Sequence, residues 1–106
     1  MTIEDWRVEI DKIDEELLRL LNERARLAVS VGESKRVAGL SVCDRERERE
    51  VIQRACRDNR GPLDDGAVAR LFRAVIRESR RLQTEARSTA PAPERCAPEA
   101  PARRSR

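Results

Sequence analysis

Apolar residues recur every three or four positions through the first third of the chain. The main seam consists of Ile3, Trp6, Ile10, Ile13, Leu17, Leu20, Leu27 and Val31, and a second ridge of Leu18, Leu21, Ala25 and Ala28 widens it. This spacing follows the α-helical period and predicts one helix that ends near Val37. Thr2 and Asp5 stand three residues apart at its start, as in a capping box, and AGLS at 38–41 ends the pattern.

Two shorter helices are predicted after this break. Asp44 is the expected N-cap of the second helix, which runs to about Asn59. Its inner face is expected to consist of Val51, Ile52, Ala55 and Cys56. RGPL at 60–63 interrupts the chain, and Asp64 or Asp65 then caps a third helix. The apolar side of this helix is expected to carry Val68, Leu71, Phe72, Val75, Ile76 and Leu82. The pattern therefore predicts an all-α chain with one long and two shorter helices.

The first helix is too long for a compact monomer. About 35 residues at 1.5 Å per residue give a length of roughly 50 Å. A compact body of this size has a radius of gyration of only about 12 to 13 Å. In a monomer most of the apolar stripe would face water, at a cost on the order of 25 cal/mol per Å². We therefore expect an obligate oligomer, most simply a two-fold homodimer in which the long helices pack together.

The amino-acid composition modifies the prediction of a helical chain only near its C-terminal end. Residues 88–106 contain four of the five prolines and show no apolar periodicity. We therefore expect a helical domain at 1–87 and a disordered Pro/Ala/Arg-rich tail at 88–106. With four Arg and two Glu, the tail carries +2 of the formal net charge of +3. The nearly neutral body argues against a nucleic-acid-binding protein.

The residue types that are missing limit the chemistry. The chain has no histidine and no tyrosine, which excludes His-dependent catalytic triads and most zinc enzymes. Cys43, Cys56 and Cys96 form no CxxC pair, which indicates a reducing compartment and no metal site. No apolar run is long enough for a membrane span, and the acidic start differs from a secretion signal, so a cytoplasmic protein is expected.

A charged residue interrupts the apolar seam of the first helix. Arg24 stands between Leu20 and Leu27, where an apolar residue would continue the heptad. A buried arginine is costly unless it is paired, so Arg24 needs either a buried glutamate or an anionic ligand. Lys35 lies eleven residues further on and returns to nearly the same face of the helix.

Polar groups also interrupt the inner faces of the other two helices. The charged run DRERERE at 44–50 divides into an inward subset, Asp44, Arg47 and Glu48, and a solvated subset, Arg45, Glu46 and Arg49. On the third helix the apolar stripe continues at Ser79 and Gln83. Either residue alone would be explained by a hydrogen bond in the core. Together, the three helices predict a pocket for a small anion that also carries a hydroxyl group.

Arg7 lies seventeen residues before Arg24, about 25 Å along the helix, whereas an arginine reaches only about 7 Å from its Cα atom. The two side chains of one chain therefore cannot hold the same small ligand. In an antiparallel dimer, Arg7 of one chain approaches Arg24 of the other.

These residues, in this order, resemble the all-helical (AroQ-class, type II) chorismate mutases over about residues 3 to 85. The resemblance is carried by R-x-x-I-x-x-I-D-E-x-L-L-x-L-L-x-E-R at 7–24, L-A-x-x-V-G-x-x-K at 27–35, D-x-x-R-E at 44–48 and LFRAVIRESRRLQ at 71–83. It implies an intertwined dimer of three-helix chains with two active sites, each completed by an arginine from the other chain. The implied reaction is the Claisen rearrangement of chorismate to prephenate, without a cofactor, in phenylalanine and tyrosine biosynthesis.

The resemblance also implies roles for individual residues. Arg24 and Arg7 of the second chain are expected to hold the two substrate carboxylates, and Ser79 assists them. Lys35 and Gln83 are expected to donate hydrogen bonds to the ether oxygen, which gains negative charge as its C–O bond breaks.

Three further roles follow from the same resemblance. Glu48, with the backbone near Asp44, is expected to bind the ring hydroxyl, and Arg47 is expected to organise the site. Arg24, Lys35, Glu48 and Gln83 are the implied catalytic groups. A unimolecular rearrangement without a proton shuttle is compatible with a chain that has no histidine.

Other functions remain open at this point. An isochorismate pyruvate-lyase would use a similar cationic pocket, and an aminodeoxychorismate mutase would bind an amine in place of the hydroxyl. An intact Glu48 favours the ordinary mutase. A helical interaction module would explain the seam, with the inward charges as buried pairs, but not the shared level of Ser79 and Gln83. The chain contains no second catalytic domain, so a free-standing enzyme is expected.

Overall fold

The computed structural model describes residues 1–86, which form three α-helices and no strand. These helices are α1 (Ile3–Val37), α2 (Arg45–Asp58) and α3 (Asp65–Ala86). The prediction of an all-α chain with a long first helix is confirmed. The tail predicted at 88–106, with Cys96, lies outside the described residues.

The helices begin at the capping residues that the sequence indicates. Thr2 Oγ1 accepts a hydrogen bond from the Asp5 backbone N–H at 3.1 Å, and Asp5 Oδ2 accepts one from the Thr2 N–H at 2.9 Å. Asp44 is the N-cap of α2. At the start of α3, Asp64 Oδ1 accepts from the Ala67 N–H at 2.7 Å. Each cap satisfies backbone donors that have no partner within the helix, and so sets where the helix starts.

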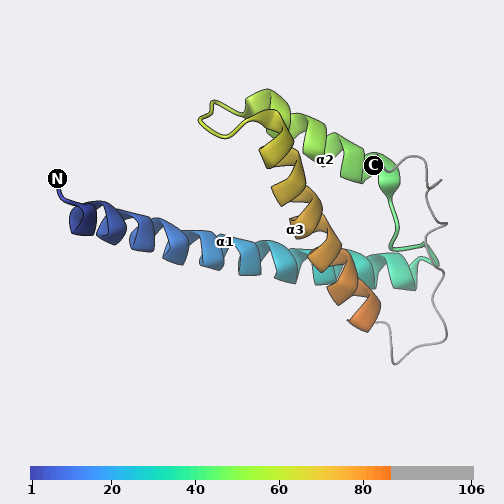
Figure 1. Ribbon diagram of the computed structural model, residues 1–106. Helices are drawn as coiled ribbons and strands as arrows, with labels where there is room; N and C mark the ends of the chain where they lie inside the picture. The colour runs from blue at the N-terminus through green and yellow to red at the C-terminus, as the bar shows by residue number, and fades with distance from the viewer. Residues whose placement is uncertain (87–106) are drawn as a thin grey trace.

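Helix α3 forms the main contacts between the three helices. It packs against both α1 and α2, whereas α1 and α2 scarcely touch each other. In Figure 1, α3 crosses the C-terminal half of α1, and the N-terminal half of α1 extends away from the other two helices. Val68, Ala69 and Ile76 on α3 are the buried apolar residues of this small core. The fold therefore brings together the C-terminal half of α1, the start of α2 and the C-terminal half of α3.

The apolar stripe of α1 is not covered within one chain. Its large apolar residues from Ile3 to Leu21 are between 38% and 67% exposed. Leu71 is also 56% exposed, which is contrary to its expected place on the inner side of α3. Neither α1 nor α2 covers this side chain.

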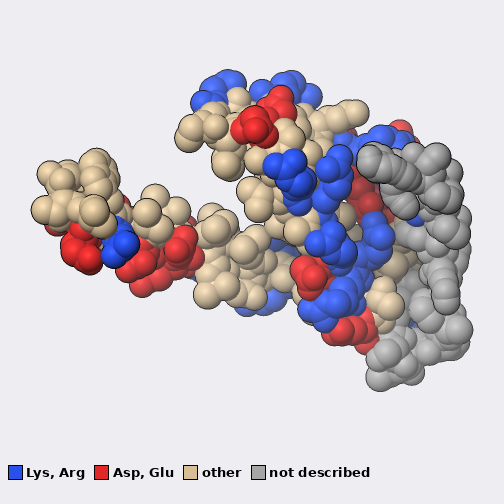
Figure 2. Space-filling model, in the orientation of Figure 1, with Lys and Arg blue, Asp and Glu red and all other residues tan. Residues whose placement is uncertain are grey.

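Charged side chains make up much of the remaining surface. Figure 2 shows acidic groups along the N-terminal part of α1 and basic groups around α3. Many belong to exposed pairs within one helix. Arg19, for example, donates to Glu16 and Glu23, and its hydrogen bond lowers the pKa of Glu16.

No helix within residues 1–86 is long and apolar enough to span a membrane. Cys56 is a free thiol.

Candidate active site

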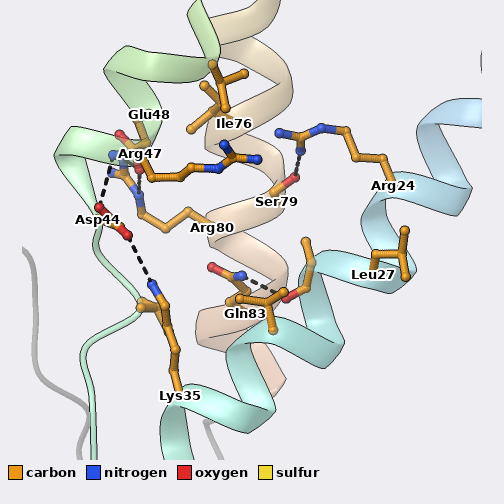
Figure 3. Close-up of a pocket in the computed structure, with 14 residues that line it drawn as sticks. Arg24, Leu27, Lys35, Asp44, Arg47, Glu48, Ile76, Ser79, Arg80 and Gln83 are labelled. Atoms are coloured by element: carbon orange, nitrogen blue, oxygen red, sulfur yellow. Dashed lines mark hydrogen bonds and ion pairs between the residues drawn. The ribbon is translucent and has the colours of Figure 1, made fainter.

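A cavity of about 260 Å³ opens where the three helices meet, and we call it the interhelical cavity. Its apolar walls are formed by Leu27, Ala28, Val31, Val42, Val51 and Ile76. Its polar lining consists of Arg24, Lys35, Asp44, Arg47, Glu48, Ser79, Arg80 and Gln83 (Figure 3). Four cationic side chains and two carboxylates thus face one small space. This excess of positive charge suits a ligand with two carboxylate groups.

Arg24 and Ser79 meet across the α1–α3 contact, as the sequence predicted. Arg24 Nη1 donates a hydrogen bond to Ser79 Oγ at 2.7 Å, and both side chains are half-buried. A guanidinium carries five N–H donors, so this bond leaves most of them available to a ligand. The serine therefore orients the arginine without neutralising its charge.

Gln83 is held against the backbone of α1. Its Nε2 donates to the Ala28 carbonyl oxygen at 2.7 Å (Figure 3). A carbonyl oxygen only accepts, so this contact sets which end of the amide faces α1. The Nε2 group has a second N–H, which remains free to donate. The neighbouring Gly32 is buried and leaves room for the Gln83 side chain.

Lys35 and Asp44 link the end of α1 to the start of α2. Lys35 Nζ lies 3.7 Å from Asp44 Oδ2, and the lysine side chain is 22% exposed. The other carboxylate oxygen of Asp44 accepts from the Arg47 backbone N–H at 3.0 Å and caps α2. One aspartate thus fixes the start of a helix and places the ammonium group of Lys35 at the cavity.

Arg47 lines the cavity, but part of its guanidinium is occupied elsewhere. Arg47 Nη1 donates to Glu50 Oε1 at 2.9 Å, and the side chain is 56% exposed. Within the charged run, Glu46 and Arg49 face solvent as expected. Arg45 is half-buried, so the prediction that it belongs to the solvated subset is wrong. It is the first residue of α2.

Arg80 is a charged residue of the cavity that the sequence patterns did not identify. Its Nε donates to Glu48 Oε2 at 3.2 Å, and its Nη2 bonds to the same oxygen. Both side chains are partly buried, at 34% and 22% exposed. Arg80 follows Ile76 by four residues and so continues the buried stripe of α3. That periodicity is the signal in the sequence that could have identified it.

Seven of the eight predicted site residues line the interhelical cavity, and Arg7 does not. Arg7 lies near the start of α1, is 68% exposed and pairs with Glu4 at 3.3 Å. This placement agrees with the length argument, which separates Arg7 from Arg24 of the same chain.

The chain matches the model of one protein family, described as chorismate mutase type II, over residues 6–84. It is 44% identical over 78 residues to the bifunctional chorismate mutase/prephenate dehydratase of Aquifex aeolicus, an alignment that spans 70% of this chain but only 22% of that protein. It is 32% identical over 82 residues to the chorismate mutase of Methanocaldococcus jannaschii, spanning 74% of this chain and 81% of that protein. The fold is similar to that of chorismate mutase from Helicobacter pylori in complex with prephenate, with a TM-score of 0.76 and 26% identity over 83% of this chain and 96% of that one.

Proposed function

The chain belongs to the chorismate mutase type II family, and we propose that it catalyses the rearrangement of chorismate to prephenate. The observation that carries the proposal is the interhelical cavity, where seven side chains of the family pattern converge from three helices. The structural similarity to a chorismate mutase in complex with prephenate supports the same ligand class for this cavity. The reaction is a step toward phenylalanine and tyrosine.

Substrate binding depends on the arginines. Arg24, oriented by Ser79, binds one substrate carboxylate, because a guanidinium matches a carboxylate with two parallel hydrogen bonds. Arg7 of a second copy of the chain binds the other. Holding both carboxylates keeps the substrate folded, with the two carbons that must join close to each other. This positioning supplies much of the rate enhancement in a unimolecular rearrangement.

Transition-state stabilisation depends on Lys35 and Gln83. The breaking C–O bond leaves negative charge on the ether oxygen, and a fixed donor stabilises that charge more than it stabilises the ground state. The long 3.7 Å contact with Asp44 leaves the Lys35 ammonium able to donate to this oxygen. Gln83 supplies its second N–H while the first remains on the Ala28 carbonyl. Both donors act without a proton transfer.

The start of α2 binds the ring hydroxyl. Glu48 accepts a hydrogen bond from this hydroxyl, and the backbone around the Asp44 cap contacts the same group. Arg47 organises this part of the cavity through its charge. A carboxylate can only accept, so Glu48 distinguishes a hydroxyl from a group that has no hydrogen to donate.

A second copy of the chain completes the site in this proposal. An apolar stripe is exposed along about half the length of α1, from Ile3 to Leu21. A self-complementary two-fold dimer buries such a stripe. The same arrangement brings Arg7 to the other chain's cavity, which Arg7 cannot reach in its own chain. We therefore propose an intertwined homodimer with two sites. Its cytoplasmic location stays a prediction.

Turnover of three substrates by the purified protein tests the proposal. We expect chorismate to be consumed with prephenate as the product, and isochorismate and the amino analogue to react at least about 10²-fold more slowly. Isochorismate carries its hydroxyl at a different ring position and leaves Glu48 without that donor, and the amino analogue brings a positive charge into a cavity lined by four cationic side chains. Pyruvate release from isochorismate would instead indicate a lyase. A folded dimer that turns over none of the three would favour the helical interaction module.

A further inference from the structure

The ion pair between Arg80 and Glu48 places a second positive charge next to the group proposed to bind the ring hydroxyl. Arg80 reaches across from α3 to Glu48 on α2, and Arg80 Nε lies 3.2 Å from Glu48 Oε2. Both side chains line the interhelical cavity and are partly buried. The charge of Glu48 is therefore compensated before any ligand binds.

The geometry of the pair leaves one carboxylate oxygen available. Both Arg80 donors, Nε and Nη2, reach the same oxygen, Oε2. Within residues 1–86 no other side chain hydrogen-bonds to the Glu48 carboxylate, so Oε1 keeps its capacity to accept. Arg80 thus fixes the orientation of the carboxylate and leaves Oε1 available to accept a hydrogen bond from a neutral donor.

Each carboxylate of the cavity has its own cation. Lys35 lies beside Asp44, and Arg47 donates to Glu50 on the surface side of α2. Arg80 is accordingly the cation that compensates Glu48. A change at Arg80 alters the charge around Glu48 while the other pairs stay in place.

We propose that Arg80 is a positioning residue that sets the specificity of the site for a hydroxyl over an amine, a proposal that rests on the proposed role of Glu48. An alkyl amine in place of the ring hydroxyl is an ammonium at neutral pH. An uncompensated carboxylate would attract it strongly. With the Arg80 guanidinium beside the carboxylate, the ammonium meets a like charge, whereas a neutral hydroxyl still donates to Oε1.

The test compares two ligands in variants at position 80. The readouts are kcat and KM for chorismate, and the inhibition constant of aminodeoxychorismate as a competitor. Arg80→Met removes the charge and keeps much of the side-chain volume, and Arg80→Lys keeps the charge. We expect Arg80→Met to lower kcat/KM for chorismate and to shift the relative affinity at least tenfold toward the amine. Arg80→Lys is expected to keep the wild-type ratio within about threefold, since a point charge still opposes the ammonium.

Matched controls separate this role from a structural one. Arg81→Met changes the next residue of α3, which is exposed and pairs with Glu78 and Glu85, and is expected to leave both ligands unaffected. If Arg80→Met does not fold, by circular dichroism and elution volume, the neutral Arg80→Gln variant is measured in its place. Equal changes for the two ligands, or no change, would overturn the proposal.

A Glu48→Gln variant distinguishes failure of this proposal from failure of the proposed function. A loss of chorismate turnover in Glu48→Gln, together with an unchanged ratio in Arg80→Met, refutes the role of Arg80 alone. Unchanged chorismate kinetics in Glu48→Gln refute the proposed role of Glu48 and, with it, the role of Arg80.

Discussion

A Cβ atom at Gly32 would lie 2.8 Å from Gln83 Cγ and 3.1 Å from Gln83 Cβ. Both atoms belong to the inner part of the glutamine side chain, which cannot move away without moving α3 or changing rotamer. The absence of a side chain at position 32 therefore lets α3 approach α1 closely enough for Gln83 to bond to Ala28. The position of one proposed transition-state donor thus depends on a glycine on another helix.

Gly32→Ala is expected to reduce turnover more than stability. The added methyl group displaces Gln83, and a donor misplaced by about 1 Å can cost on the order of 10²-fold in rate. Alanine favours the helix by about 1 kcal/mol over glycine, which offsets part of the packing strain. The measurements are kcat and the thermal midpoint. Gly66→Ala in the first turn of α3 is the control, since its new Cβ meets Asp64 Oδ1 at 3.4 Å, an ordinary contact; a normal kcat in Gly32→Ala would contradict this account.

Gln83→Glu is expected to shift the pH optimum of turnover toward acid. The wild-type amide donates at any ordinary pH, whereas a glutamate donates only when protonated, and its usual pKa is about 4.3. An ionised glutamate would also face the Ala28 carbonyl oxygen that now accepts from Gln83 at 2.7 Å. The rate of the variant should therefore rise as the pH falls. A flat pH–rate profile for Gln83→Glu would remove Gln83 from the mechanism.

Lys35→Ala is expected to lower kcat by on the order of 10²-fold or more. The variant lacks the ammonium group that stabilises the negative charge developing on the ether oxygen as the C–O bond breaks. The same change frees Asp44, which still caps α2 through its other oxygen, so the fold should persist. Lys12 is the other lysine of the sequence, is 67% exposed and pairs with Glu9, so Lys12→Ala provides the control. Near-normal turnover by Lys35→Ala would refute its assignment.

The fold could be predicted from the sequence because its determinants are local. The apolar period of α1 and the caps at Thr2, Asp44 and Asp64 set the ends of the helices within a residue or two of the observed bounds. The convergence of Arg24 and Ser79 followed from the same periodicity, since both interrupt an apolar stripe.

The pairings of long charged side chains could not be predicted in this way. Helical period assigns a residue to a face, but it does not decide which of several nearby partners a flexible side chain selects. Glu48 pairs with Arg80 on another helix, whereas Arg47 pairs with Glu50 on its own. The bond from Gln83 to the Ala28 carbonyl likewise depends on how closely two helices approach.

Mixing two inactive variants tests the proposed dimer. Arg7→Ala and Arg24→Ala should each be nearly inactive as homodimers, since every site lacks one arginine. In a mixed dimer one site has both arginines and the other has neither. Random reassociation makes half of the dimers mixed, so about a quarter of the wild-type activity should return. Mixed dimers without recovered activity would show that Arg7 does not act in the site of the other chain.

The role of the interhelical cavity is tested by the rate at which the purified protein converts chorismate to prephenate, compared with the rate of Arg24→Ala. Substrate loss is followed continuously, and the product is identified by NMR. We predict prephenate as the product and a loss of at least about 10²-fold in kcat/KM for Arg24→Ala, because the variant lacks the guanidinium that holds a substrate carboxylate. A folded wild-type protein that leaves chorismate unchanged, or an Arg24→Ala variant as active as wild type, would contradict the assignment of the interhelical cavity as the active site of a chorismate mutase.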